Sequence, residues 1–424
     1  MINKIRALVL MFLLNNLGVQ SDVLAWDDGV THKDLSEYAA TNSILDKSKG
    51  DYLKTIGFND GLYEWLRWNG NKTIKEGYVI AWLREGAHLE DASSFGFPIL
   101  PGSTTRSFNH FHNPLKPWTQ AGLNDFWIGE SSLLWAQDGA YQQYFPDGDW
   151  SWQKTREHYY TALTGRDFTG AIIAPDKAKK DEYFARTFKG LGHQMHLIQD
   201  AAQPDHVRND AHPEDTFSGV ITPIGFEKWA GGKFKTVGDL KAFAPSPIFP
   251  SLSLDPSQYT LDSSYSTRNL VPSALFLDTD QYDGLNASAG INQGLAEYTN
   301  ANFFSDDTIF AAERYPISDG HYFPYPKKSS TDLQSYIDEN KLPGVVIGED
   351  NIPDTSFWIK KERDGESIIE HFVRPGYFTR YINPFIALYY RTFYRDEKCH
   401  EDYASLLIPR AVGYSAGLLN YFFR

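Results

Sequence analysis

Residues 192–206, Gly-His-Gln-Met-His-Leu-Ile-Gln-Asp-Ala-Ala-Gln-Pro-Asp-His, contain the side chains whose types and spacing best suggest chemistry. On a helix, His196 and Asp200 lie four residues apart, so both project from one face about one turn from each other. An imidazole nitrogen and a carboxylate oxygen can then bind the same metal ion. His206 follows Pro204, which stops a helix, and the chain there can turn back toward the same face.

The helix that would carry this pair is predicted over residues 179–202 and should lie buried at the centre of the fold. Apolar residues occur on nearly every face of it: Phe184, Phe188, Leu191, Met195, Leu197 and Ile198. A His-x-x-x-Asp pair often arises by chance. A buried carboxylate without a partner is very costly, however, and this favours a metal site.

Other helices are predicted around this central one. Thr31 can cap a helix that begins at His32, with Asp34 placed to return the hydrogen bond. Residues 73–91 and 151–163 also follow helical patterns, whereas residues 92–118 are rich in Gly, Pro, Ser, Thr and Asn and should form a long loop. The predicted fold class is mainly α, a multi-helix bundle.

The second half of the chain is less regular. Residues 236–290 are dense in Pro, Ser, Asp and Gly and are expected to form surface excursions. Residues 344–348 and 357–370 resemble short β-strands, the latter a pair joined by an Asp-Gly turn. Residues 376–424 return to helical patterning and are too apolar to stand alone, so we expect residues 236–424 to pack on the core formed by residues 26–235.

Composition limits the chemistry. The 424 residues are 42% hydrophobic, enough to fill a sizeable core, and the net charge of −14 argues against a protein that coats duplex nucleic acid with Lys and Arg. Cys399 is the single cysteine, so neither an intramolecular disulfide nor a thiolate-rich zinc site can form. Any metal must therefore be bound by nitrogen and oxygen ligands.

The first 25 residues have the features of a secretory signal peptide. Lys4 and Arg6 precede an apolar run over residues 7–14, which is too short for a stable membrane anchor, and Ala25 ends the segment. Cleavage there would leave Trp26 as the new amino terminus. The protein is therefore expected to be secreted or periplasmic.

The pattern His196-x-x-x-Asp200-x-x-Gln203-Pro204-x-His206 resembles the core signature of the zinc-dependent phospholipase C family and of its relatives, the single-strand-specific zinc nucleases. In that superfamily an amino-terminal tryptophan chelates one zinc ion with a nearby histidine. Trp26 and His32 resemble that pair. An α-amino group, with a pKa near about 8, gives up its proton to a metal readily.

The resemblance extends to two further segments. Residues 86–91, ending in Asp91, and residues 109–114, which contain His110, are similar to places that supply an aspartate and a histidine in the family. His112 is the rival of His110. By this match Asp91 and His110 join His196 and Asp200 at one zinc ion, and Asp200 bridges to the ion at Trp26 and His32.

A third zinc site is matched less closely. Family members place His206 with a further histidine and an acid on one helix, a spacing that this chain lacks. The best assignment for this site is His206, His212 and Glu227, with Asp210, Glu214 and Asp215 as rivals. The fold is then a helical bundle around a cluster of about three zinc ions.

What the resemblance implies is hydrolysis of phosphate esters, with Asp91 as the general base that holds the attacking water. The His-Phe-His-Asn-Pro sequence at 110–114 is nearer the phospholipase branch, so the expected substrate is phospholipid and membrane-surface contact is expected. The alternatives are a single-strand nuclease or 3'-nucleotidase-like phosphodiesterase, and a non-catalytic zinc-binding surface protein. No obligate protein partner is expected.

The remaining histidines have simpler explanations. His88, His158, His321, His371 and His400 are expected to be surface or packing residues. His193 lies three residues before His196 and is a candidate to orient a ligand through a hydrogen bond.

Overall fold

The computed structural model describes residues 31–91, 106–123, 129–137, 139–142, 148–210, 225–251, 272–282, 294–305, 308, 358–361, 368–375 and 393–424. It confirms the mainly helical fold class. The longer described helices are α2 (Thr31–Ala40), α4 (Val79–Asp91), α7 (Trp152–Thr164), α8 (Lys177–Asp200) and α14 (Glu397–Phe422). Shorter ones are α3 (Tyr52–Thr55), α5 (Ser132–Gln137), α6 (Gly139–Gln142), α9 (Phe226–Lys233), α10 (Val237–Phe243) and α11 (Leu295–Asn302).

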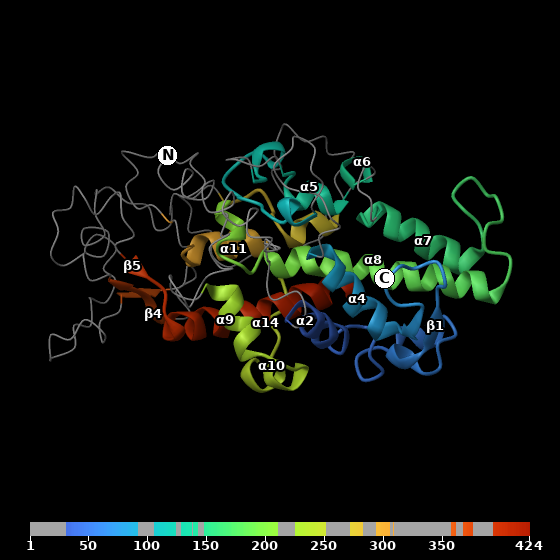
Figure 1. Cartoon of the computed structure of the whole chain (residues 1–424), viewed down its shortest axis with the longest axis horizontal. Coiled ribbons are helices and arrows are strands. Elements are labelled where there is room, and N and C mark those ends of the chain that lie inside the picture. The colour runs from blue at the N-terminus through green and yellow to red at the C-terminus, as the bar shows by residue number, and fades with distance from the viewer. Residues whose placement is uncertain are drawn as a thin grey trace, which may run out of the picture.

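Helix α8 is the central element, as predicted. The Asp176 side chain caps its start by accepting a hydrogen bond from the Lys179 N–H at 2.8 Å, and from Thr187 to Asp200 every residue is buried. The helix ends four residues before Pro204. Helices α4, α7 and α14 all contact α8, and Figure 1 shows α8 running through the middle of the described part of the molecule.

Two glycines allow α4 and α8 to touch backbone to backbone. A Cβ on Gly86 would lie 1.9 Å from the carbonyl oxygen of Lys189, and one on Gly192 would lie 2.2 Å from that of Leu83. Both distances are far below any real contact, so these positions require glycine. The close crossing brings the C-terminal ends of the two helices together, and these ends carry Asp91, His196 and Asp200.

The helix predicted over residues 73–91 begins only at Val79, so the first part of that prediction is wrong. Residues 76–78 instead form β2 (Glu76–Tyr78), which pairs antiparallel with β1 (Trp65–Arg67). The aromatic rings of Trp65 and Tyr78 lie directly opposite in this register, with centroids 5.0 Å apart. Cross-strand pairing, which the local pattern does not reveal, replaces the first turns of the expected helix. Four 3₁₀ turns, η1 (Gly61–Tyr63), η2 (Arg106–Asn109), η3 (Trp118–Gln120) and η4 (His206–Arg208), connect these elements.

Part of the segment expected to form surface excursions is buried. Within residues 236–290, the turn η8 (Pro272–Phe276) contacts α5 and α14, and Leu275, Phe276 and Leu277 are almost completely buried. The Pro, Ser and Asp content of the segment suggested exposure, but its three consecutive apolar residues fill the core. The expectation is therefore wrong at residues 274–277.

The C-terminal region contains a small sheet with strand order β3-β4-β5. Strands β3 (Trp358–Lys361) and β4 (Ile368–Pro375) pair antiparallel, which confirms the predicted pair, and β5 (Phe393–Tyr394) pairs with β4. The Asp-Gly turn between β3 and β4 and the strand predicted at 344–348 lie outside the described residues. Helix α14 contacts α2, α8 and β4.

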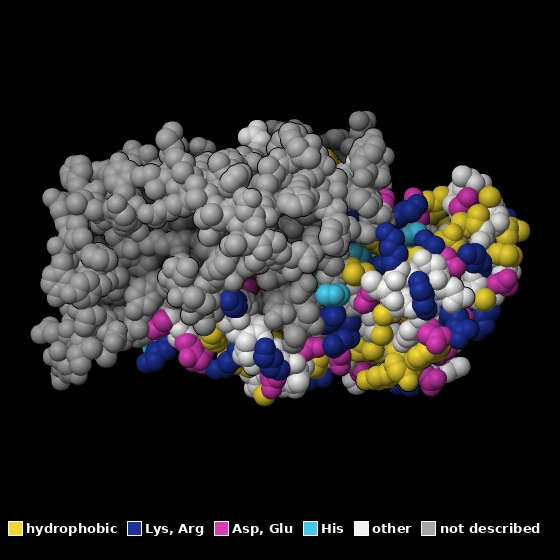
Figure 2. All heavy atoms as spheres, viewed as in Figure 1, with side chains coloured by type: hydrophobic (Ala, Val, Ile, Leu, Met, Phe, Trp, Pro, Cys, Tyr) yellow, Lys and Arg dark blue, Asp and Glu magenta, His cyan; other side chains and the backbone are white. Residues whose placement is uncertain are grey.

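One large cluster of buried hydrophobic residues joins most of the described elements, from Leu35 in α2 to Phe423 after α14, and a small second cluster contains Phe108, Phe111 and Leu123. On the face drawn in Figure 2, the described surface carries basic, acidic and hydrophobic side chains intermingled. In the described part of the chain, no helix combines the length and the hydropathy that a membrane crossing requires.

Candidate metal centre

Five of the predicted ligands converge where α2, α4 and α8 meet the segment after η2. They come from four separate elements: His32 from α2, Asp91 from the end of α4, His110 from the turn after η2, and His196 and Asp200 from α8. All five are buried, with Asp91 the most exposed at 6%.

The ligand atoms of these residues lie close together. Asp200 Oδ2 lies 3.0 Å from both His110 Nδ1 and His196 Nε2, and Asp200 Oδ1 lies 3.4 Å from His32 Nε2. Asp91 Oδ1 lies 3.2 Å from His110 Nδ1 and 3.5 Å from His196 Nε2. The ligand atoms form two groups of three that share His196, the first with His32 and Asp200 and the second with Asp91 and His110.

Two of the histidines are oriented by hydrogen bonds on the side away from the carboxylates. His196 Nδ1 lies 2.7 Å from the carbonyl oxygen of Ala87, which can only accept, so Nδ1 carries the proton. His32 Nδ1 lies 2.7 Å from Gln199 Oε1, whose amide nitrogen donates to Ser36 Oγ at 3.0 Å. In both rings the lone pair therefore belongs to Nε2, which faces the cluster, as a metal ligand requires.

The buried carboxylates complete the fit to a cation. Both oxygens of Asp91 and both of Asp200 lack a hydrogen-bond donor with acceptable geometry among the described residues. Buried polar groups are almost always satisfied, and a buried carboxylate is especially costly without compensation. Nitrogen and oxygen donors in this combination suit zinc.

The charges are strongly coupled. Burial by itself lowers the pKa of His196, but the carboxylates of Asp200 and Asp91 outweigh it and raise that pKa to about 10. The same carboxylates raise the pKa of His110 against the effect of burial. The neighbouring imidazoles in turn hold the pKa of Asp200 and of Asp91 below the usual range, although burial alone would raise both. A cation bound among these groups would replace the imidazole protons.

His206 and Glu227 lie at the edge of the cluster. His206 Nε2 lies 3.3 Å from Glu227 Oε1, and His206 Nδ1 lies 3.7 Å from Asp200 Oδ2. The His206 ring stacks on Phe111 with centroids 4.5 Å apart. The structure thus brings together two of the three side chains predicted for the third site. His206 lies in the turn η4 and Glu227 in the helix α9.

Several predicted site residues lie outside the described part of the chain, namely Trp26, His212, Glu214 and Asp215. The rival ligand Asp210 is described and is buried. Its backbone N–H donates to the carbonyl oxygen of Asp205 at 3.0 Å.

His112, the rival of His110, is engaged elsewhere. Its Nδ1 lies 2.7 Å from Ser131 Oγ and its Nε2 lies 2.8 Å from Asp278 Oδ2, which also accepts a hydrogen bond from Trp118 Nε1 at 2.7 Å. Among the other histidines, His158 and His400 pack against aromatic rings, and His371 contacts Asp402.

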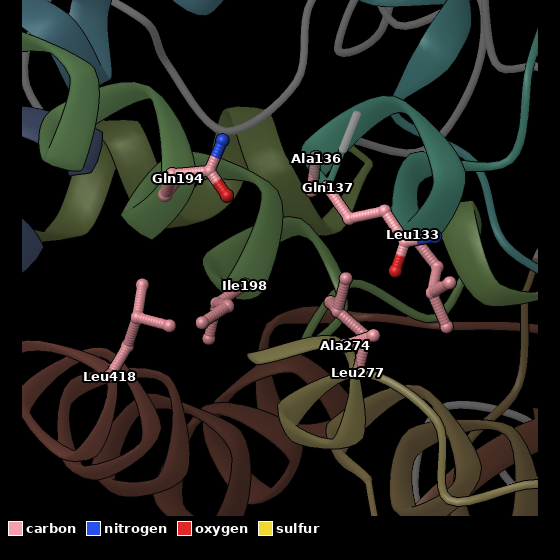
Figure 3. Close-up of a pocket in the computed structure, with 8 residues that line it drawn as sticks. All are labelled: Leu133, Ala136, Gln137, Gln194, Ile198, Ala274, Leu277 and Leu418. Atoms are coloured by element: carbon pink, nitrogen blue, oxygen red, sulfur yellow. The ribbon is translucent and has the colours of Figure 1, made fainter. Parts of the chain in front are cut away.

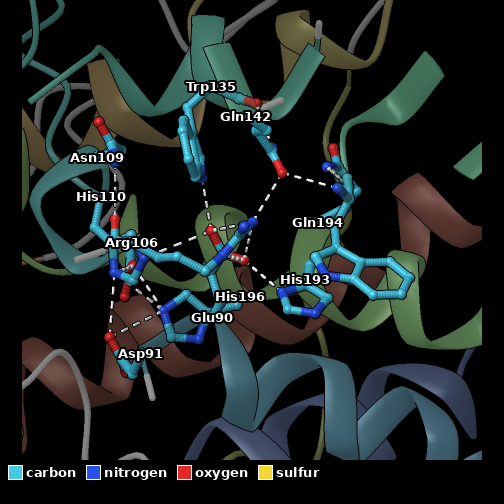
Figure 4. A network of polar contacts seen from close by, with 12 residues as sticks. Glu90, Asp91, Arg106, Asn109, His110, Trp135, Gln142, His193, Gln194 and His196 are labelled. Atoms are coloured by element: carbon cyan, nitrogen blue, oxygen red, sulfur yellow. Dashed lines mark hydrogen bonds and ion pairs between the residues drawn. The ribbon is translucent and has the colours of Figure 1, made fainter. Parts of the chain in front are cut away.

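Sequence reasoning missed two residues next to the cluster, Glu90 and Gln199, and also Asp278, which bonds His112 outside it. Gln199 bonds His32, Asp278 bonds His112, and Glu90 approaches His110 and contacts His193 (Figure 4). Glu90 could have been noticed, because it lies directly before Asp91 in an apolar helix. His193 was expected to orient a ligand through a hydrogen bond, but it contacts Glu90, which is not one of the clustered ligands, and burial lowers the pKa of His193 to about 3.

The described cavity shown in Figure 3 is a separate feature. It is small and mostly apolar, with Gln137 and Gln194 as its polar lining, and none of the clustered ligands borders it. It lies between α5, α8, η8 and α14 and has no bearing on the chemistry of the cluster.

Comparisons with known proteins do not assign the chain: no family model, curated protein or solved structure matches it. The structure itself shows a mainly helical protein whose buried histidine and aspartate side chains form two overlapping groups that could hold metal ions.

Proposed function

We propose that the cluster binds zinc ions and that the protein hydrolyses phosphate esters in the manner of the zinc-dependent phospholipase C family. The observation that supports this best is the pair of three-ligand groups sharing His196, with lone pairs directed inward by Ala87 and Gln199. Closely spaced cations suit an anionic substrate such as a phosphate ester. The resemblance over residues 26–206 points to the same class.

The clustered residues would bind the zinc ions and the attacking water as follows. His32, His196 and Asp200 would hold one ion, and Asp91, His110 and His196 or Asp200 another, with His206 and Glu227 offering donors to a third. Bound zinc supplies Lewis acidity and lowers the pKa of a water molecule toward about 7. Asp91, whose pKa is held low by its imidazole neighbours against burial, is a deprotonated carboxylate that can orient a water molecule and accept its proton.

We further propose a phospholipid head-group ester as the substrate and a secreted or periplasmic location. The His-Phe-His-Asn-Pro sequence supports the phospholipase branch. The signal-like residues 1–25 support export, and their removal would free the Trp26 amine as a ligand. Separate incubation of the mature protein with phosphatidylcholine vesicles and with denatured DNA decides between the branches, since only phospholipid cleavage is expected.

Replacement of the shared carboxylate tests the metal assignment. Asp200→Asn keeps the side-chain shape but removes the charge, so bound zinc should be lost and turnover of p-nitrophenylphosphorylcholine should fall more than about 100-fold, beyond the effect of residues that only support a ligand. Asp402→Asn is the matched control, because it alters an Asp–His contact, with His371, outside the cluster. Near wild-type zinc content and turnover in Asp200→Asn would disprove the assignment.

A further inference from the structure

Glu90 is a buried carboxylate held from several sides next to the cluster (Figure 4). Arg106 Nε donates to Oε2 at 2.9 Å and Arg106 Nη2 donates to Oε1 at 3.2 Å. Trp135 Nε1 donates to Oε1 at 2.7 Å, and His193 Nδ1 contacts Oε2. These contacts come from η2, α5 and α8, so the carboxylate has little freedom to move.

The same carboxylate faces the outer nitrogen of a proposed ligand. Glu90 Oε1 lies 3.8 Å from His110 Nε2. The other nitrogen of that ring, Nδ1, faces Asp91, Asp200 and His196 Nε2, the last at 3.3 Å. Because His196 carries its proton on Nδ1, its Nε2 lone pair points at His110 Nδ1, so either a proton on His110 Nδ1 or a bound cation must lie between the two nitrogens.

We propose that Glu90 is a positioning residue that accepts the Nε2 proton of His110 and thereby keeps the Nδ1 lone pair directed at the bound metal. His32 has Gln199 in this role and His196 has the Ala87 carbonyl, so Glu90 gives the third histidine the partner that the other two possess. The 3.8 Å separation must shorten to about 3.2 Å or less for this hydrogen bond to form. This inference rests on the proposed metal centre.

Arg106 has partners besides Glu90, so the position of its guanidinium does not depend on that carboxylate alone. The guanidinium also donates to the Gly148 carbonyl at 3.1 Å and to Gln142 Oε1 at 2.8 Å, and it lies over the Trp135 ring, 4.8 Å from the centroid. Arg106 is therefore fixed by neutral groups and presents its charge to Glu90. A carboxylate fixed in this way is a typical outer partner of a ligand histidine.

The test separates this role from a purely structural one. Glu90→Met removes the acceptor for the His110 Nε2 proton, and Glu90→Met/Arg106→Met removes both charges so that no unpaired guanidinium is left buried. Gln142→Met is the matched control, because it alters the same network on the side of Arg106 away from His110. For each purified protein, zinc affinity is measured by competition with a chelator, and unfolding of the metal-free form is followed by circular dichroism.

We expect both Glu90 variants to bind zinc roughly 10- to 100-fold more weakly than wild type, while Gln142→Met loses stability but not affinity. Should one of the two Glu90 variants fail to fold, the other gives the same readout. Wild-type affinity in a folded Glu90 variant, or an equal loss in Gln142→Met, would overturn the inference and leave the metal centre standing. A wild-type protein that binds no zinc would instead overturn the proposed function.

Discussion

The pKa of a buried histidine in this protein depends on which groups face its ring. His196 lies between two carboxylates, which raise its pKa to about 10 although burial lowers it. His158 is almost as deeply buried but faces Trp150, Tyr183 and the charges of Arg186 and Lys154. Burial first, and these cations second, lower the pKa of His158 to about 3. His196 at the cluster thus retains its proton, whereas His158, 38 residues earlier in the chain, is a neutral packing group.

This contrast predicts an acid-dependent loss of stability. His158 stays neutral in the folded protein down to about pH 3, whereas it takes up a proton below about pH 6.5 in the unfolded chain. The unfolded state therefore binds more protons in that window, and the free energy of unfolding falls as pH is lowered, by about 1.4 kcal/mol per unit from this residue. In metal-free protein, His158→Phe should flatten the dependence between pH 6 and 4, measured by urea unfolding. An unchanged slope would contradict the lowered pKa.

The sequence pointed to individual site residues where local spacing carried information. His196 and Asp200 share a helical face. The preference for His110 over His112 came from the family resemblance and not from spacing; the structure places His110 inside the cluster and His112 outside it. Glu90 and Gln199 were not foreseen as supporting residues, because their roles depend on which helix packs against theirs. Spacing within one helix does not contain that information.

At the scale of elements, the contact between α4 and α8 determines the site. Gly86 and Gly192 let the two backbones meet, and the crossing sets the position of Asp91 relative to His196. The sequence predicted both helices, yet β1 and β2 replaced the first turns of the expected helix over 73–91. That strand pairing joins the backbones of residues about ten positions apart, which the helical periodicity of one segment does not reveal.

Enlarging one of these glycines should disturb the cluster without touching a ligand. Gly192→Ala places a Cβ 2.2 Å from the Leu83 carbonyl oxygen and should force α4 away from α8, lowering the free energy of unfolding by about 1 to 3 kcal/mol or more. Zinc affinity should fall as well, since Asp91 moves with α4. Thermal unfolding and chelator competition measure the two effects.

The control is Gly232→Ala in α9, where a Cβ meets nothing within 4 Å. Helix propensity alone should then stabilise that variant by about 0.5 to 1 kcal/mol. If Gly192→Ala behaved like Gly232→Ala, the close approach of the two helices would not be what holds the site.

At the scale of the whole molecule, residues beyond 236 contact the segments that carry His110 and His206. Asp278 bonds His112 and Trp118, and Asn300 Nδ2 donates to the Val207 carbonyl at 2.7 Å. Arg395 Nη2 lies within 3.3 Å of both carboxylate oxygens of Asp205, and both side chains are buried. These contacts join positions up to 190 residues apart. The burial of residues 274–277 likewise depends on distant elements, α5 and α14, which the composition of one segment does not reveal.

Breaking the Arg395 pair should therefore destabilise the folded chain far more than breaking a surface pair. Arg395→Met removes one partner of a buried ion pair, which costs about 3 to 5 kcal/mol. Arg67→Gln breaks the exposed pair with Glu76 and should cost less than about 1 kcal/mol. Chemical denaturation of both variants measures the difference, and equal effects would mean that residues 393–424 do not stabilise the segment before His206.

The most direct measurement is the metal content of the mature wild-type protein. Elemental analysis is done after purification without added metal and again after incubation with zinc and removal of the excess. We expect about two to three tightly held zinc ions per chain, and their loss in Asp200→Asn. A folded wild-type protein that retains no zinc under either condition would contradict the assignment of the histidine and aspartate cluster as a metal centre.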